Sequence, residues 1–125
     1  MISHLTLGTN NLELAIKYYD QLLKLFDAKQ IAKTDQVVFY ALANSSTKLA
    51  ITKPHNGDIA TSGNGTMLAL KAPNEQLVQA VYTLAISLGS KCEGQPGPRD
   101  NGAYTAAYFR DLDGNKLVVF YRPDK

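Results

Sequence analysis

Apolar residues along this chain change their spacing in a fixed order, and the order occurs twice. In the first half, residues 2–9 alternate apolar and polar side chains, as a half-buried strand does. Apolar residues then recur at steps of three and four over residues 12–26, which predicts an amphipathic helix with Asn10 or Asn11 as its N-cap. Three short strands are predicted next, at 29–32, 36–43 and 48–53.

The second half follows the same order. Residues 67–70 predict a strand, residues 73–88 a helix that Gly89 ends, and residues 90–93 a brief strand. A loop rich in Gly and Pro is expected over 94–102. The chain then predicts a β-hairpin of residues 104–110 and 116–121, because the Asp113-Gly114 step between two β-branched and aromatic runs favours a tight turn.

The two halves align with each other. An offset of 63 places Leu5 on Leu68 and Asn11 on Asn74, and an offset of 68 places Lys48 on Lys116. Each half is expected to be too short to bury a core alone. The sequence therefore predicts one α+β domain of two βαβββ modules, with module 1 at about 1–54, a linker at 55–65 and module 2 at about 66–123.

Composition narrows the classes of function. The 125 residues have a net charge of +2 and scattered lysines, which argues against a nucleic-acid partner. The single cysteine, Cys92, excludes an internal disulfide. No segment approaches the roughly 20 apolar residues of a membrane span, and the first residues lack a signal-peptide pattern. The expected location is the cytoplasm, without a membrane partner.

Three segments resemble those of the vicinal-oxygen-chelate superfamily: the turn from Phe109 to Lys116, the opening from His4 to Glu13, and the segment from Gly94 to Arg99. That superfamily includes glyoxalase I, extradiol dioxygenases, and bleomycin- and fosfomycin-resistance proteins. The resemblance covers almost the whole chain. It implies curved, mixed four-stranded sheets that form a cleft, with helices on the outer faces.

The resemblance also locates the positions of metal ligands. In the metal enzymes of the superfamily, two histidines and two acidic or amide side chains typically occupy the positions that correspond here to His4, Ala50, Met67 and Val118. Only His4 is a good ligand, whereas divalent metals need about three or four protein donors. His55 is expected to be a solvated loop residue. We therefore expect no metal and no other cofactor, the alternative being a divalent metal held by other ligands.

Strand alternation assigns the remaining pocket residues. The expected cleft-facing residues are His4, Thr6, Tyr40, Ala50, Thr52, Met67, Ala69, Tyr108, Val118 and Phe120. This mostly apolar set suits a small aromatic or amphipathic molecule. Within it, His4 is either a general base or a packing residue bonded to Tyr108 or Thr6. Arg99, expected at the cleft mouth, either binds an anion or is solvated.

Three hypotheses of function follow. The first is a metal-free protein of the superfamily that binds a small organic molecule. The alternative is an enzyme, either a metal-dependent lyase or isomerase similar to lactoylglutathione lyase or a dioxygenase, and His4 is then the candidate catalytic residue. The third is a non-catalytic subunit with a vestigial pocket. A homodimer is expected, with the cleft formed either within one chain or across the dimer.

Overall fold

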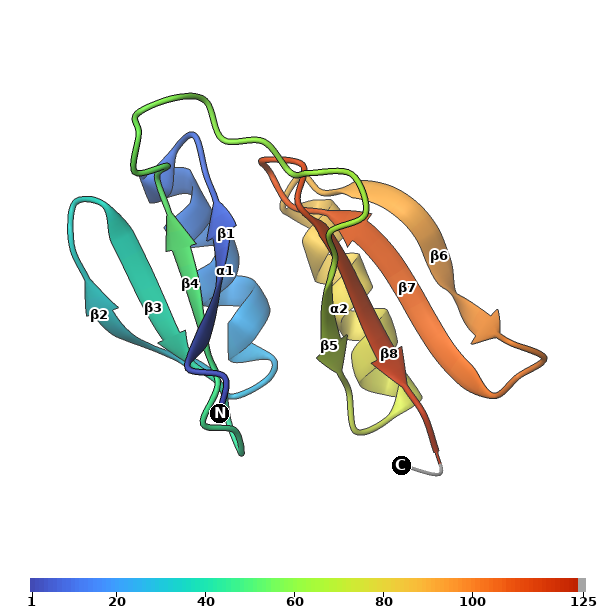
Figure 1. The fold of residues 1–125 in the computed structure, drawn as a ribbon. Helices are drawn as coiled ribbons and strands as arrows, with labels where there is room; N and C mark the ends of the chain where they lie inside the picture. Colours follow the sequence, from blue (N-terminus) through green and yellow to red (C-terminus); the bar gives the residue numbers. More distant parts are fainter. Residues whose placement is uncertain (124–125) are drawn as a thin grey trace. The chain divides into compact units, whose positions relative to one another are not determined.

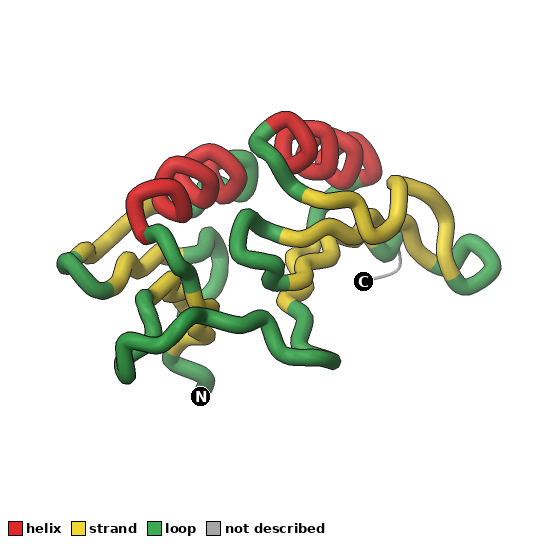
Figure 2. The backbone as a smooth tube through the Cα atoms, turned by 90° about the horizontal axis from the view of Figure 1, so that it is seen from above, coloured by secondary structure: helices red, strands yellow, loops and turns green. Residues whose placement is uncertain are grey.

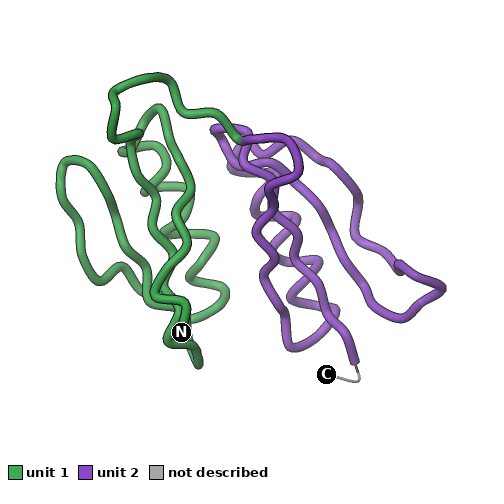
Figure 3. The backbone as a smooth tube through the Cα atoms, in the orientation of Figure 1, with its two compact units in different colours: residues 1–62 green, residues 63–125 purple. Residues whose placement is uncertain are grey.

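The computed structural model describes residues 1–123. The chain divides into two compact units, Met1–Ser62 and Gly63–Lys125, drawn in green and purple in Figure 3. Each unit contains one strand, one helix and three further strands in that order. The predicted α+β fold of two βαβββ modules is therefore confirmed.

Unit 1 is a four-stranded mixed sheet with a helix on one face (Figures 1 and 2). Its elements are β1 (His4–Gly8), α1 (Leu12–Lys24), β2 (Lys29–Lys33), β3 (Val37–Ala41) and β4 (Lys48–Thr52). The strand order is β1-β4-β3-β2, in which β1 and β4 are parallel and the other pairs are antiparallel.

Unit 2 repeats this arrangement. Its elements are β5 (Leu68–Lys71), α2 (Glu75–Ser87), β6 (Lys91–Arg99), β7 (Tyr104–Arg110) and β8 (Lys116–Tyr121). The strand order is β5-β8-β7-β6, and β5 and β8 are its parallel pair. The hairpin strands β7 and β8 have the bounds that the sequence predicts.

Both helices begin at an asparagine cap. The side-chain oxygen of Asn11 accepts a hydrogen bond from the Leu14 amide at 3.1 Å, and that of Asn74 from the Leu77 amide at 2.8 Å. These bonds satisfy amides that would otherwise have no partner at a helix start. Asn10, the other candidate, instead accepts a bond from the Ala60 amide at 2.7 Å. Within residues 1–123, neither helix is long and apolar enough to span a bilayer.

The core of each unit lies between its helix and its sheet. Buried side chains of α1 in unit 1 are Tyr18, Tyr19, Leu22 and Leu23, with Val38, Leu49 and Ile51 on the strands. In unit 2 they are Val78, Val81 and Ala85 of α2, with Phe109, Leu117 and Val119 on the strands. Leu5 is 43% exposed, and its strand, β1, lies at the edge of the sheet.

The prediction of a loop at 94–102 is wrong for residues 94–99, which belong to a strand. β6 continues to Arg99, and its pairing with β7 shifts register on either side of Gly94. A Cβ at Gly94 would lie 3.1 Å from Cδ1 of Tyr108 and 3.2 Å from Nη2 of Arg99, so glycine permits this close approach. The connecting turn is short and includes Asp100 and Asn101, both with positive φ.

Candidate functional site

In unit 2 the face of the sheet opposite α2 is rich in aromatic residues. Thr105 marks the helix-covered face, because its hydroxyl donates to Glu75 of α2 at 2.8 Å. Its neighbours Tyr104 and Ala106 therefore point to the other face. Paired residues share a face, and the pairs Ala106–Phe120, Tyr108–Val118 and Ala69–Val118 join three strands there. We call Tyr104, Tyr108 and Phe120, together with Ala69, Ala106 and Val118, the aromatic face.

The small side chains between the rings are buried, and the rings themselves are partly exposed. Ala106 and Val118 are 0% and 4% exposed, whereas Tyr104, Tyr108 and Phe120 remain half-buried. The Tyr104 and Phe120 rings meet edge to face, with centroids 6.5 Å apart and planes at 85°. Such a pair is a favourable geometry and leaves ring surface available for a third ring. The arrangement is chemically suited to contact with a planar apolar group.

Cationic side chains lie over these rings. The Nζ atom of Lys116 is 5.4 Å from the Tyr108 ring centroid, and the guanidinium carbon of Arg99 is 5.6 Å from it. The guanidinium carbon of Arg122 is 4.8 Å from the Tyr104 centroid. Attraction between a cation and a ring face holds each pair together. The aromatic face is thus bordered by positive charge.

Arg99 is the last residue of β6 and is held in place by its own strand. Its guanidinium donates to the carbonyl oxygens of Gln95 at 2.8 Å, Gly97 at 2.8 Å and Pro98 at 3.2 Å. These bonds fix the position of the charge but use much of its capacity to donate. A purely solvated Arg99, one of the two roles expected from sequence, does not fit this geometry.

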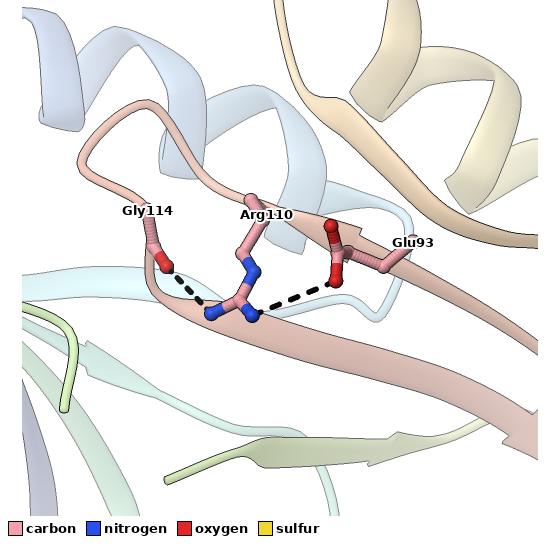
Figure 4. A network of polar contacts seen from close by, with 3 residues as sticks. All are labelled: Glu93, Arg110 and Gly114. Carbon is pink, nitrogen blue, oxygen red and sulfur yellow. Dashed lines mark hydrogen bonds and ion pairs between the residues drawn. The ribbon is translucent and has the colours of Figure 1, made fainter. Parts of the chain in front are cut away.

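Arg110 connects the turn of the hairpin to β6. It donates to the Gly114 carbonyl at 3.0 Å and forms an ion pair with Glu93 at 3.5 Å (Figure 4). Both side chains of the ion pair are partly exposed, so the pair contributes little to the free energy of folding. Because of this ion pair, the positive charge of Arg110 is already balanced by the Glu93 carboxylate.

The two tyrosines of the aromatic face interact with each other. A hydrogen bond with Tyr108 is the largest cause that raises the pKa of Tyr104, and the nearby Asp100 carboxylate raises it further. Arg122 acts in the opposite direction. Tyr104 is therefore a neutral phenol at physiological pH, available for hydrogen bonding rather than for charge.

The face of unit 1 opposite α1 contains His4 and Thr6. Thr6 pairs with Ala50, which pairs with Phe39. The exposed His4 ring meets Phe39 edge to face at 5.2 Å, and its Nδ1 is hydrogen-bonded to Ser3 Oγ at 3.0 Å. Sequence reasoning missed Phe39, although the pairing of β3 with β4 puts it beside Ala50.

Tyr40 lies on the opposite face from the one expected. It pairs with Leu49 and is 1% exposed, and its hydroxyl donates to Asp20 of α1 at 2.7 Å. Burial, followed by this hydrogen bond to a carboxylate, raises the pKa of Tyr40. A cavity of about 460 Å³ lies beside it, lined by Asp20, Lys24, Asp27, Ala28, Lys29, Gln30 and Tyr40.

Three further predicted site residues are Thr52 and His55 of unit 1 and Met67 of unit 2. The Thr52 hydroxyl lies 2.9 Å from the Lys53 carbonyl and 3.2 Å from that of Gln36, so its proton is donated to the backbone. Met67 precedes β5 and is 46% exposed. His55 is an exposed residue of the segment after β4.

The residues at the four positions of the superfamily's metal ligands do not fit a metal ion. Ala50 and Val118 are 1% and 4% exposed and have no side-chain lone pair. Met67 offers only a soft thioether, and His4 supplies the single imidazole. In the described part of the chain, no group of three or more His, Cys, Asp or Glu is placed to hold a metal.

Comparisons of the sequence and of the structure with known proteins point to the same family. A family model described as Glyoxalase/Bleomycin resistance protein/Dioxygenase superfamily matches residues 1–119. The structure is similar to that of a glyoxalase/bleomycin resistance protein from Albidiferax ferrireducens T118. The TM-score is 0.88 and the identity 36%, over 98% of this chain and 99% of that one. None of the curated protein sequences compared with the chain matches it.

Two more distant structures share the fold. Lactoylglutathione lyase from Agrobacterium tumefaciens has a TM-score of 0.70 at 20% identity, over 97% of this chain and 92% of that one. A fosfomycin resistance protein from Listeria monocytogenes, complexed with Mn(II) and sulfate, has a TM-score of 0.75 at 20% identity. That match covers 98% of this chain and 90% of the other. At such identities the likeness concerns the fold alone.

Proposed function

This chain belongs to the glyoxalase/bleomycin resistance protein/dioxygenase superfamily, and we propose that it binds a small aromatic or amphipathic organic molecule without a metal ion. The observation that supports this most is the aromatic face of unit 2. There Tyr104, Tyr108 and Phe120 present half-buried rings above a floor of small apolar side chains. Binding sites for small molecules combine such apolar surface with a few polar groups.

The chemistry of the face favours a planar ligand. A ring placed against Tyr108 or Phe120 removes apolar surface of both partners from water, which is favourable by about 25 cal/mol for each Å² buried. Stacked or edge-to-face geometry adds about 0.5–1.5 kcal/mol for each aromatic pair. The neutral Tyr104 hydroxyl offers a hydrogen bond that orients the ligand.

A metal-free mode of binding is supported by the donor set. A single imidazole, that of His4, stands at the four positions where the superfamily's metal enzymes have ligands, and Val118 forms part of the apolar floor instead. We therefore assign the ligand's contacts to rings, hydroxyls and cations. No step of the proposed binding involves a metal.

The test is a binding experiment with backbone resonances of ¹⁵N-labelled protein and a set of small aromatic molecules. We expect shifts concentrated on β7 and β8, and a loss of affinity of about tenfold in Phe120→Ala, because one ring contact and its buried area are removed. Leu112→Ala, which shortens an exposed apolar side chain of the same hairpin, is the control. Shifts that avoid β7 and β8, or equal affinities for both variants, would overturn the proposal.

A further inference from the structure

We propose that the aromatic face of unit 2 selects aromatic molecules that bear a carboxylate, and that Lys116 is the residue that receives the carboxylate. This inference rests on the proposed function and adds the charge of the ligand to it. It follows from the positive charges that border the rings. It also follows from the hydrogen bonds and ion pairs that some of these cations already make with other groups.

The border of the aromatic face is cationic overall. Lys116, Arg99 and Arg122 each lie within 5.6 Å of a tyrosine ring centroid of this face. Lys71 pairs with Phe120 and therefore shares the face. Two opposing charges are Asp100, near Tyr104 at one end of the face, and Glu93, which is paired with Arg110. The surroundings of Tyr108 are therefore positive.

The cations differ in their availability to a ligand. Arg110 is paired with Glu93. Arg99 donates three hydrogen bonds to backbone carbonyls, as described above. Arg122 lies over the Tyr104 ring, with its guanidinium carbon 4.8 Å from the centroid, and not over Tyr108.

Lys116 lies on the strand that carries Val118 and Phe120, and its ammonium group is over the Tyr108 ring. It contacts the Tyr108 ring, and the Arg110–Glu93 ion pair of this face does not include it. Its ammonium group has three donors on a flexible stem, which suits the capture of a carboxylate whose position is set by a ring.

The strand register brings charge and rings together. Lys116 pairs with Arg110, and Tyr108, two residues before Arg110 on β7, pairs with Val118. Lys116, Val118 and Phe120 therefore follow one another along the same side of β8. Lys116 Nζ is 5.4 Å from the Tyr108 centroid, so it is close to the edge of a ligand ring that packs against Tyr108. A carboxylate attached directly to that ring fits this spacing.

Two probes of equal shape and different charge test the inference: 2-naphthoate and its neutral amide, 2-naphthamide, each titrated by calorimetry at low and high salt. We expect naphthoate to bind more tightly than naphthamide, with an affinity that falls as salt rises. Lys116→Met retains the apolar stem and should lower the affinity for naphthoate about fivefold, the upper range for a partly exposed ion pair, without changing that for naphthamide. Lys33→Met, an exposed lysine of β2 in unit 1, is the matched control.

The outcomes separate this inference from the proposed function. Equal affinity of the two probes on β7 and β8, or naphthoate binding that Lys116→Met leaves unchanged, overturns carboxylate selection and leaves aromatic binding intact. Failure of both probes to bind contradicts both proposals. A loss of naphthoate affinity in Lys33→Met equal to that in Lys116→Met reduces the effect to net charge and also overturns the assignment of Lys116.

Discussion

Asn115 donates two hydrogen bonds to the carboxylate of Asp111. Its backbone amide reaches Oδ1 at 2.9 Å, and its side-chain amide reaches Oδ2 at 2.8 Å. The Asp113 amide also donates to Oδ1, at 2.9 Å. Asp111 and Asn115 are each 5% exposed. The Asp111 carboxylate is therefore hydrogen-bonded to these amide groups instead of to water. The turn fixes the register of β8 and thereby positions Lys116 and Phe120.

Asp111→Ala should lower the free energy of unfolding by about 3 kcal/mol. The substitution removes three charge-assisted hydrogen bonds and leaves buried amide donors without their acceptor. Urea denaturation followed by circular dichroism measures the change. Asp35→Ala, at an exposed position, is the control and should change the free energy by less than about 0.5 kcal/mol. Equal effects of the two variants would contradict the role assigned to Asp111.

Asn11→Ala and Asn74→Ala should each destabilise the protein by about 1 kcal/mol, because each removes the acceptor for an amide in the first turn of a helix. Glycine at the same positions retains the extended backbone at lower cost, about a few tenths of a kcal/mol. Comparing Ala with Gly at each position by urea denaturation separates capping from other effects. Equal losses for Ala and Gly would show that the side-chain bond does not act as a cap.

Tyr40 should make the stability dependent on alkaline pH. Its pKa is raised in the folded protein above the value of about 10 in an unfolded chain, mainly by burial. A raised pKa means that the contribution is complete below pH 10 and is lost as pH rises above it, because the unfolded state releases the proton more readily. Wild type should therefore lose more stability between pH 9 and pH 11 than Tyr40→Phe does. Parallel losses in urea melts would contradict this.

The fold was predictable because each local pattern agreed with the repeat. The two asparagine caps lie 63 residues apart, as the alignment of the halves requires, and the helices they start have equal length. The bounds of β7 and β8 followed from the turn at Asp113-Gly114, whose glycine has a φ of 88°. These signals are local, and the tertiary structure does not oppose them.

The candidate site was only partly predictable. Alternation placed Tyr108, Val118 and Phe120 on one side of β7 and β8, and in the structure they lie opposite α2. Tyr40 was assigned to the side of β3 that Phe39 occupies. Alternation fixes which residues of a strand share a face, and the face that meets the helix depends on register with its neighbours. The sequence did not predict that β6 extends to Arg99, because glycines and prolines usually indicate a loop. Here they permit an irregular pairing of β6 with β7.

Binding without a metal is the central claim, and one experiment tests it most directly. Protein purified without chelators is analysed for Ni, Zn, Fe and Mn, and 2-naphthoate is then titrated by calorimetry before and after dialysis against EDTA. We expect far less than one metal ion per chain and the same affinity in both titrations. About one ion per chain that His4→Ala removes, together with naphthoate binding that EDTA abolishes, would contradict the claim.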